Sequence, residues 1–349
     1  MQRITIQHVA KAAGVSVSSV SHYQNGRYHH LRPETIERIR KCIAELGYSP
    51  SRVALQLKSG QTPMVGLLVP SIDNPYHADL ALALDQEALK AGLRPVLGNG
   101  QRDAAREKAF IDELIEYGVR GFISTSELRD AAAMSEYVKR GIAFALFDLR
   151  LVDIGGLNGI DVVSINNALA TSRAVDHLAA LGHRRIAFLT TPPSSANRTA
   201  RLDGYVAALE RNGLSDPLVI SIKDDENTEI GDSGLAGFAE KAAEKLLESY
   251  PGTTAVIGIN SIVTIGICAG LQQLGVKVPK DISLIGVDNI KLSSMMVPTI
   301  TSLGADYGAM AAQAVEYLRT RLAAPSIPGR ETIYVPELIV RQSTTVPSP

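Results

Sequence analysis

Two hydrophobic patterns alternate along the chain from about residue 65 onward. Short, continuous apolar runs predict buried strands, at 65–70, 94–99, 121–126, 144–149, 162–166, 185–190, 218–222, 255–259 and 282–287. Between these runs, segments such as ALALDQEALKAG, IDELIEYG and AVDHLAALGH carry apolar residues at helical spacing. Apolar strands that alternate with helices are typical of parallel sheets with both faces covered. Four strands before residue 150 and about as many after residue 160 predict two similar α/β lobes.

The first fifty residues follow a helical pattern instead. Thr5 can cap a helix over 6–13, and Ser16 can cap a second helix over 17–24 after a glycine turn. Two short helices joined by a tight turn that contains glycine make a helix-turn-helix, although a plain helical hairpin would show the same pattern. A third helix is predicted over 33–46, with proline at its first position and glycine just past its end.

The charge of this segment favours DNA as its partner. Residues 1–60 hold nine Lys or Arg against three Asp or Glu, which is +6 (9 − 3), although the whole chain carries −1. Concentrated positive charge on a small domain is typical of proteins that bind a polyanion. The second helix would expose methyl, hydroxyl and imidazole groups that can contact base edges or phosphates in a major groove. The candidate DNA contacts are Thr5, Ser16, Val17, Ser18, Ser21, His22, Asn25 and His29.

Composition restricts the class of protein. The chain has 349 residues, of which 45% are hydrophobic and 20% charged, as in folded proteins of two or three domains. No apolar run approaches the roughly 20 residues of a membrane span, and the N-terminus lacks the apolar core of a signal peptide, so we expect a cytoplasmic protein. Cys42 and Cys268 match no metal-binding spacing and are expected to be buried thiols. We predict neither a metal site nor another cofactor.

Five longer stretches resemble one known family. They span nearly the whole chain and read ITIQHVAKAAGVSVSSVS, ETIERIRKCIAELGYSP, SRVALQLKSGQTPMVGLLVPSIDNPY, HLAALGHRRIAFLT and VPKDISLIGVDN. They resemble the lac repressor (LacI/GalR) family of bacterial transcription regulators. The resemblance implies an N-terminal all-α helix-turn-helix headpiece over 1–49, a hinge helix or linker over 50–61, and an α/β core over 62–349. This core would be two-lobed, periplasmic-binding-protein-like and built on parallel sheets, with one lobe over about 62–163 and 294–324 and the other over about 164–293 and 325–349.

The resemblance also implies a function. Proteins of this family bind double-stranded operator DNA of pseudo-palindromic sequence as homodimers, and a small-molecule effector between the two lobes modulates their affinity for DNA. The resemblance favours a repressor. This chain has His22 where relatives commonly carry arginine, which can bind guanine with two hydrogen bonds, so we expect a different operator half-site.

The segment between headpiece and core allows two interpretations. Residues 51–58 are compatible with a helix but too few to form a stable one alone. The resemblance implies that two copies fold over the DNA minor groove, where Ala54 allows their close approach and Leu57 inserts between base pairs. Without the resemblance, a flexible linker whose leucines touch the core is the simpler interpretation.

Polar residues follow several of the predicted strands. Ligands of parallel sheets bind beyond the carboxyl ends of the strands, and the resemblance assigns effector contacts to residues there. Carboxylates and an amide can bind hydroxyl groups, a guanidinium can clamp paired oxygens, and an aromatic ring can cover an apolar face. The predicted effector is therefore a sugar or another hydroxyl-rich compound, although purines are also bound in this family. The candidate effector contacts are Ser71, Tyr76, Asp148, Arg201, Asn260 and Asp288.

Other classes of protein remain as alternatives. The chain has no nucleophile elbow, P-loop, HExxH or dinucleotide-binding glycine triplet after its first strand, so we predict no catalytic residues. Asp148 and Asp288 could form a carboxylate pair for glycoside hydrolysis, with only their positions at strand ends in favour. A solute-binding or carbohydrate-processing protein of the same core fold, without a regulatory role, is the main alternative, and the basic N-terminal segment argues against it. The C-terminal RQSTTVPSP lacks leucine heptads, so we expect a dimer and not a tetramer, with no membrane partner.

Overall fold

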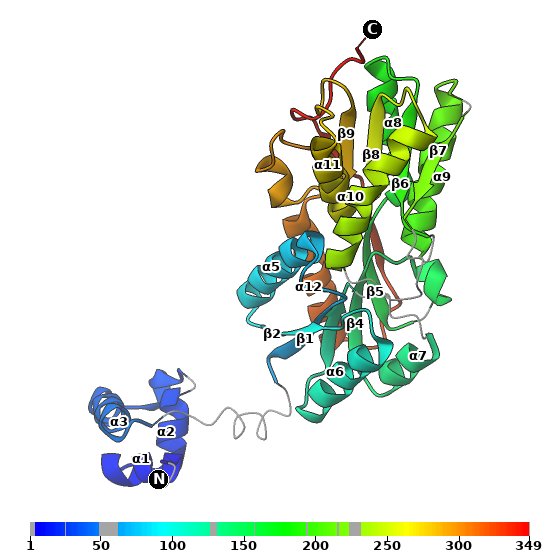
Figure 1. The fold of residues 1–349 in the computed structure, drawn as a ribbon. Coiled ribbons are helices and arrows are strands. Elements are labelled where there is room, and N and C mark those ends of the chain that lie inside the picture. The colour runs from blue at the N-terminus through cyan, green and yellow to red at the C-terminus, as the bar shows by residue number, and fades with distance from the viewer. Residues whose placement is uncertain are drawn as a thin grey trace. The chain divides into compact units, whose positions relative to one another are not determined.

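The computed structural model describes residues 4–24, 26–48, 62–125, 131–156, 158–192, 195–214, 216–222 and 232–348. The chain divides between Thr62 and Pro63 into two compact units, the headpiece and the core, which we describe separately (Figure 1). Among the described helices, none is long and apolar enough to cross a membrane.

In its described residues, the headpiece has the three predicted helices and one short 3₁₀ helix. The predicted helices have the predicted bounds, which are Ile6–Ala13 (α1), Val17–Gln24 (α2) and Pro33–Leu46 (α3). The 3₁₀ helix η1, Tyr28–His30, follows α2. Val9, Val20 and Ile39, one from each helix, are fully buried and form the centre of a small apolar core. The crossing of α1 and α2 over this core is the geometry of a helix-turn-helix.

Local chemistry explains where these helices begin and end. The backbone N–H of Ser19 donates to Oγ of Ser16, 3.1 Å away, so Ser16 caps α2 as predicted. The backbone N–H of Thr5 donates to Nδ1 of His8 at 3.2 Å, which closes the first turn of α1. Gly14 ends α1 with φ 62°, a left-handed conformation that favours glycine. The cap residue of α3 is Arg32, whose side chain makes no capping bond.

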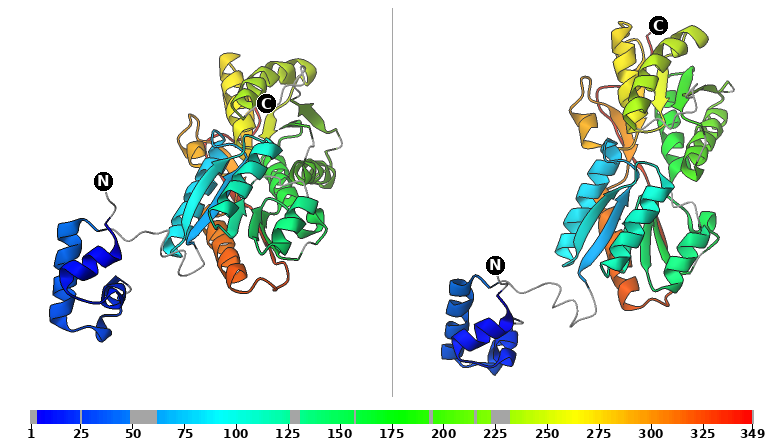
Figure 2. Two further views of the ribbon diagram at one scale, coloured as in Figure 1. Left: turned by 90° about the horizontal axis from the view of Figure 1, so that it is seen from below. Right: turned by 60° about the horizontal axis from the view of Figure 1, so that its bottom comes forward.

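The first lobe of the core is a six-stranded parallel sheet between two layers of helices (Figure 2). Its order is β11-β5-β4-β3-β1-β2, and its register is parallel throughout. One face is covered by α5 (Pro75–Lys90) and α12 (Tyr307–Ala323), the other by α6 (Ala104–Glu116) and α7 (Ala131–Lys139). The strands are Met64–Val69 (β1), Arg94–Asn99 (β2), Gly121–Ser124 (β3), Ala143–Phe147 (β4), Ile160–Ile165 (β5) and Glu331–Tyr334 (β11), and β4 is followed by η2 (Leu151–Ile154).

The second lobe repeats this plan in the order β12-β10-β9-β8-β6-β7. Two helix pairs pack on its sheet, α8 (Asn167–Ala180) with α9 (Ala196–Arg211) and α10 (Asp232–Ser249) with α11 (Ser261–Gln273). The α8–α9 contact is so close that a Cβ on Gly204 would lie 2.1 Å from the carbonyl oxygen of Ala168. The strands are Ile186–Thr190 (β6), Leu218–Ser221 (β7), Ala255–Gly258 (β8), Ser283–Val287 (β9), Thr301–Gly304 (β10) and Glu337–Ile339 (β12), with η3 (Lys291–Ser294) after β9.

Sheet pairing corrects two expected lobe boundaries and adds one detail of the second sheet. Strand β10 pairs with β9 in the second lobe, so assigning all of 294–324 to the first lobe was wrong, although α12 does pack there. Strand β11 pairs with β5 in the first lobe, so assigning all of 325–349 to the second lobe was also wrong. The chain crosses between the lobes three times, as expected, but the second and third crossings lie later in the sequence than expected. Strand β12 runs antiparallel to β10, so the second sheet is not parallel throughout.

The two cysteines differ in burial. Cys268 is buried in α11, as predicted, and both thiols are free. Cys42 is only partly buried against the headpiece core, so the expectation of two buried thiols holds for one of them. It lies on α3.

Candidate functional site

A chain of hydrogen bonds runs along the strand ends where the two lobes meet. In the first lobe, the Tyr76 hydroxyl donates to Oδ2 of Asp148 at 2.6 Å. Across the lobes, the Asn197 side-chain amide donates to the carbonyl oxygen of Asp148. The Asn167 amide donates to Oδ1 of Asn197 at 3.1 Å, and its own Oδ1 accepts from Nε of Arg201 at 2.7 Å. Arg201 in turn bonds to Asp288. We call the residues that these bonds join the polar chain: Tyr76, Asp148, Asn197, Asn167, Arg201 and Asp288.

The polar chain ends in a buried ion pair. Arg201 and Asp288 are only 8% and 7% exposed, and Nη2 of Arg201 lies 3.0 Å from Oδ1 of Asp288. Nη1 of Arg201 donates to the carbonyl oxygen of Ile259 at 2.6 Å, while Oδ2 of Asp288 accepts from the backbone N–H of Ser261 at 3.3 Å. Burial opposes the charge on Arg201, but Asp288 and then Asp148 outweigh it and raise the pKa of the guanidinium. The guanidinium of Arg201 is therefore charged at neutral pH.

The two aspartates occupy equivalent places in the two lobes. Asp148 follows β4 and Asp288 follows β9, and both have left-handed backbones, with φ 57° and 75°. Such conformations are strained for residues other than glycine and persist where the surroundings hold them, often at ligand sites. Here the Tyr76 hydroxyl and the Arg201 guanidinium hold the two carboxylates. Burial, followed by the charge of Asp148, raises the pKa of Tyr76 well above its ordinary value, so its hydroxyl stays a donor.

The structure joins four of the six predicted effector contacts and leaves two apart. Tyr76, Asp148, Arg201 and Asp288 belong to the polar chain. Ser71 is buried after β1, where its hydroxyl donates to Asp73. Asn260 caps α11, with its Oδ1 accepting from the N–H of Val263 at 2.9 Å. Both lie at strand ends as expected, but the hydrogen bonds described for them are to residues nearby in the sequence.

The sequence did not point to several members of this region. Asn167 and Asn197 link Asp148 to Arg201 within the polar chain. The Tyr307 ring contacts the Tyr76 ring edge-on, with 5.6 Å between the ring centroids. Burial and the carboxylates of Asp288 and Asp148 raise the pKa of Tyr307 well above its ordinary value. Position just after a predicted strand could have identified Asn167. Asn197 and Tyr307 lie inside helical patterns, where no local signal separates them from surface residues.

Several buried hydroxyl groups near the strand ends lack partners. The hydroxyl oxygens of Thr125, Thr191 and Ser261 are buried and accept or donate no hydrogen bond among the described residues. Thr125 follows β3, Thr191 follows β6, and Ser261 begins α11 after β8. Buried polar groups are normally hydrogen-bonded, so unpaired ones need an explanation. A ligand with several hydroxyl groups would provide one.

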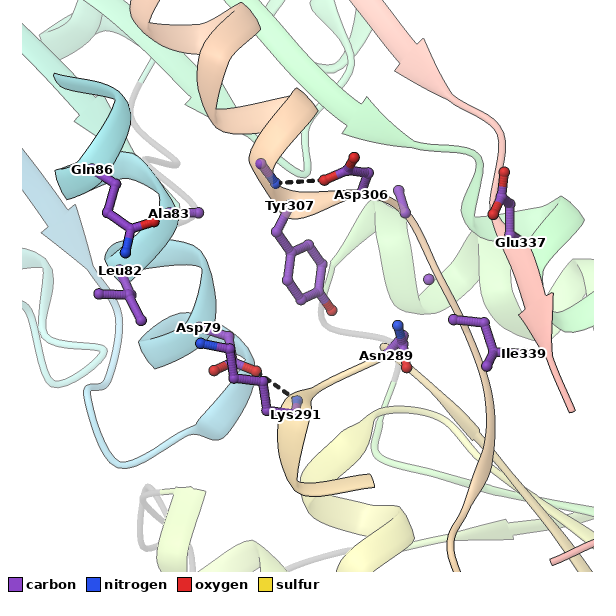
Figure 3. Close-up of a pocket in the computed structure, with 13 residues that line it drawn as sticks. Asp79, Leu82, Ala83, Gln86, Asn289, Lys291, Asp306, Tyr307, Glu337 and Ile339 are labelled. Atoms are coloured by element: carbon purple, nitrogen blue, oxygen red, sulfur yellow. Dashed lines mark hydrogen bonds between the residues drawn. The ribbon is translucent and has the colours of Figure 1, made fainter. Parts of the chain in front are cut away.

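A cavity of about 470 Å³ lies beside the polar chain. It is lined by α5, by the segments that follow β9 and β10, and by β12, and it includes none of the six predicted effector contacts. Figure 3 shows the Tyr307 ring standing among the lining residues, with Asp79 accepting from the backbone N–H of Lys291 at 2.8 Å. Tyr307 lines the cavity and contacts the Tyr76 ring of the polar chain, and the cavity itself is a separate hollow between residues of both lobes.

On the headpiece, the predicted DNA contacts form an exposed surface around α2. Val17 is 43% exposed, and Thr5, Ser16, Ser18 and His29 are also exposed. Ser21 and His22 are half-buried. The Ser16 hydroxyl forms hydrogen bonds with the hydroxyls of Ser18 and Ser19, at 2.7 and 2.9 Å, so the serines of this turn stabilise each other. Asn25, Ala54 and Leu57 lie outside the described residues.

Comparison with known proteins identifies the family. Residues 5–51 match the model of bacterial regulatory proteins of the lacI family, and residues 175–344 match a periplasmic binding protein-like domain. The HTH-type transcriptional regulator PtxS of Pseudomonas putida is 30% identical over 98% of this chain and 96% of its own length. The chain belongs to the LacI family. The ribose operon repressor of Escherichia coli is another relative, 28% identical over 97% of this chain and 99% of its own length.

Solved structures agree on the fold of this LacI-family protein. The lac repressor dimer bound to operator and an anti-inducer superposes with a TM-score of 0.83, covering 99% of this chain and all of that one at 24% identity. A LacI-family regulator from Enterococcus faecium with bound ribose has a TM-score of 0.69 over 82% of this chain and all of that one, also at 24% identity. Membership of the LacI family, which the sequence relatives show, makes the protein a DNA-binding transcriptional regulator modulated by a small molecule, and not an enzyme.

Proposed function

We propose that the polar chain is the effector site and that a sugar or similar polyhydroxyl compound binds there. The observation that carries this proposal is the set of polar groups at the strand ends of both lobes, some bonded to each other and some unpaired. Carboxylates accept from hydroxyl groups, while the guanidinium of Arg201 keeps two N–H donors beyond the three bonds described. The aromatic rings of Tyr76 and Tyr307, which meet edge-on, supply an apolar surface. A relative's structure contains ribose, a compound of this class.

The same geometry suggests how the effector acts on DNA binding. The bond between Asn197 and the carbonyl oxygen of Asp148 crosses the lobes, as does the bond between Asp79 and Lys291. An effector that replaces or extends such bonds changes the preferred angle between the lobes. It shifts operator affinity by its differential affinity for the two arrangements, and by no more than that.

At the headpiece, we propose that α2 enters the major groove of operator DNA and that the exposed side chains of its first turns contact bases. Val17 supplies a methyl surface for thymine, and Ser18, Ser21 and His22 supply hydrogen-bonding groups. Thr5, Ser16, Asn25 and His29 would contact the phosphates beside them. The protein acts as a repressor in the cytoplasm, with Ala54 and Leu57 of the hinge in the minor groove.

We further propose a homodimer on a pseudo-palindromic operator. An exposed apolar stripe supports it: Leu82 and Leu89 lie two turns apart on α5, and Leu97 lies on β2, the edge strand that α5 packs against. They are 43%, 42% and 52% exposed. A second copy would cover this stripe and set the two headpieces on one duplex. Light scattering at micromolar concentration should give a dimer, and a monomer would contradict the proposal.

Two experiments test the function. Selection from a random duplex library should enrich a sequence with two related half-sites, and equal binding to all duplexes would refute operator recognition. A thermal-shift screen of neutral sugars, sugar acids and nucleosides should find a compound that raises the melting temperature. Arg201→Lys should abolish that shift and Arg211→Lys, in an exposed ion pair of the same helix, should keep it. If Arg201→Lys keeps the full shift, the effector binds elsewhere.

A further inference from the structure

Three imidazole rings lie together on the surface of the headpiece. His22 is on α2, whereas His29 and His30 are in η1. The ring centroids of His22 and His30 are 5.0 Å apart, and those of His29 and His30 are 4.0 Å apart. His29 and His30 are exposed and His22 is half-buried, so a large partner can reach all three. We call these three residues the imidazole cluster.

The backbone, and not the rings, holds the cluster together. The N–H of Arg27 donates to the carbonyl oxygen of His22 at 2.9 Å, and the N–H of Gly26 donates to that of Tyr23 at 3.2 Å. The rings of Tyr23 and Tyr28 meet edge to face at 5.7 Å beside the cluster. These contacts fold η1 back against α2 and bring the backbones of the three histidines together.

The cluster faces cationic groups. In the described part of the chain, no three His, Cys, Asp or Glu side chains are arranged to hold a metal ion, so the chemistry left to the cluster is protonation. Around His30 stand His29 and Arg27 from its own segment and His22 from α2. From α3, Arg40 faces Tyr23 and is paired with Glu37 at 2.6 Å. Repulsion from His29, with smaller effects of partial burial, His22 and Arg27, lowers the pKa of His30.

We propose that His30, within the imidazole cluster, takes up a proton from solvent when the headpiece binds DNA and is a further phosphate contact. Operator affinity then rises as the pH falls. The physical reason is that phosphates supply the negative charge that the cluster lacks in the free protein. A ring that is neutral beside two other imidazoles and an arginine becomes a cation beside a phosphate. The inference rests on the proposed contact between α2 and DNA, because that contact is what would bring the cluster close to phosphates.

The test measures binding of the full-length protein to the duplex enriched by selection, at pH 6, 7 and 8 and constant salt. Linkage relates the slope of log affinity against pH to the number of protons taken up, so each proton taken up predicts about tenfold tighter binding per pH unit. His30→Gln should reduce this dependence, and His30→Arg should bind tightly at pH 8 with little dependence. His177→Gln, a histidine of α8 bonded to Thr344, is the control and should keep the wild-type slope.

Calorimetric titration of the wild-type protein at pH 7, in two buffers of different ionisation enthalpy, measures proton uptake without any variant. Net uptake is the expected result. Absence of uptake, equal affinity at pH 6 and 8, or an unchanged slope in a folded His30→Gln variant would each overturn the proposal while operator binding stands. If selection enriches no duplex, the proposed function itself fails, and the two failures are thus distinguishable.

Discussion

Replacement of Asp288 by asparagine tests the buried ion pair at the end of the polar chain. The variant keeps the shape of the side chain but removes its charge, which leaves the Arg201 guanidinium buried without a carboxylate. Removing one partner of a buried pair costs about 3–5 kcal/mol of unfolding free energy. Because Nε and Nη1 of Arg201 keep their bonds to Asn167 and Ile259, we expect the lower end, about 3 kcal/mol.

Urea unfolding of the full-length protein, followed by circular dichroism, measures this loss. Asp176→Asn is the matched control, since Asp176 pairs with Arg211 at 2.8 Å while the two side chains are 43% and 53% exposed. An exposed pair of this kind contributes at most about 1 kcal/mol. The double variant Arg201→Met with Asp288→Asn should regain part of the loss, because neither charge is then buried alone.

The reasoning would be refuted if Asp288→Asn cost no more than Asp176→Asn. Such a result would mean that solvent reaches Arg201 and that the pair is not the buried anchor of the site. Asp288→Asn should also reduce the thermal shift produced by any effector found in the screen, whereas Asp176→Asn should leave it unchanged.

Three further predictions concern other parts of the molecule. Burial opposes the charge of Asp161, but its bonds from Arg321 and Arg330 outweigh burial and lower its pKa. The stabilisation of the fold by the Asp161 carboxylate is therefore present above its unfolded pKa of about 3.9 and is lost as the pH falls through its lowered folded pKa. Between pH 6 and pH 3, the urea midpoint of Asp161→Asn should therefore fall less steeply than that of wild type. Equal slopes would contradict this. Ser16→Ala removes the cap of α2 and should destabilise the headpiece by about 1 kcal/mol, seen as faster amide exchange at Ser19, while unchanged exchange would show that the cap is dispensable. Leu57→Ala should weaken operator binding and keep the effector-induced thermal shift, and unchanged operator affinity would rule out the minor-groove wedge.

Local chemistry made the headpiece predictable from sequence. Its three predicted helices begin and end at the predicted residues because caps and glycine turns act within four or five positions of the chain. The same holds for the nine apolar runs, each of which became a strand of the core. Family membership was equally visible, since its motifs are spread over nearly the whole chain.

Tertiary structure decided which lobe each late segment joins and which polar residues meet. β10, β11 and β12 are only three or four residues long, and their pairing depends on which sheet edge is open where the chain crosses between lobes. Tyr76, Asp148, Arg201 and Asp288 could be predicted as residues at strand ends, but their pairing by way of Asn167 and Asn197 could not. Arg201 and Asp288 are 87 positions apart and meet within the second lobe, whereas Asn197 and Asp148 meet across the lobes, and no local pattern in a sequence encodes such contacts.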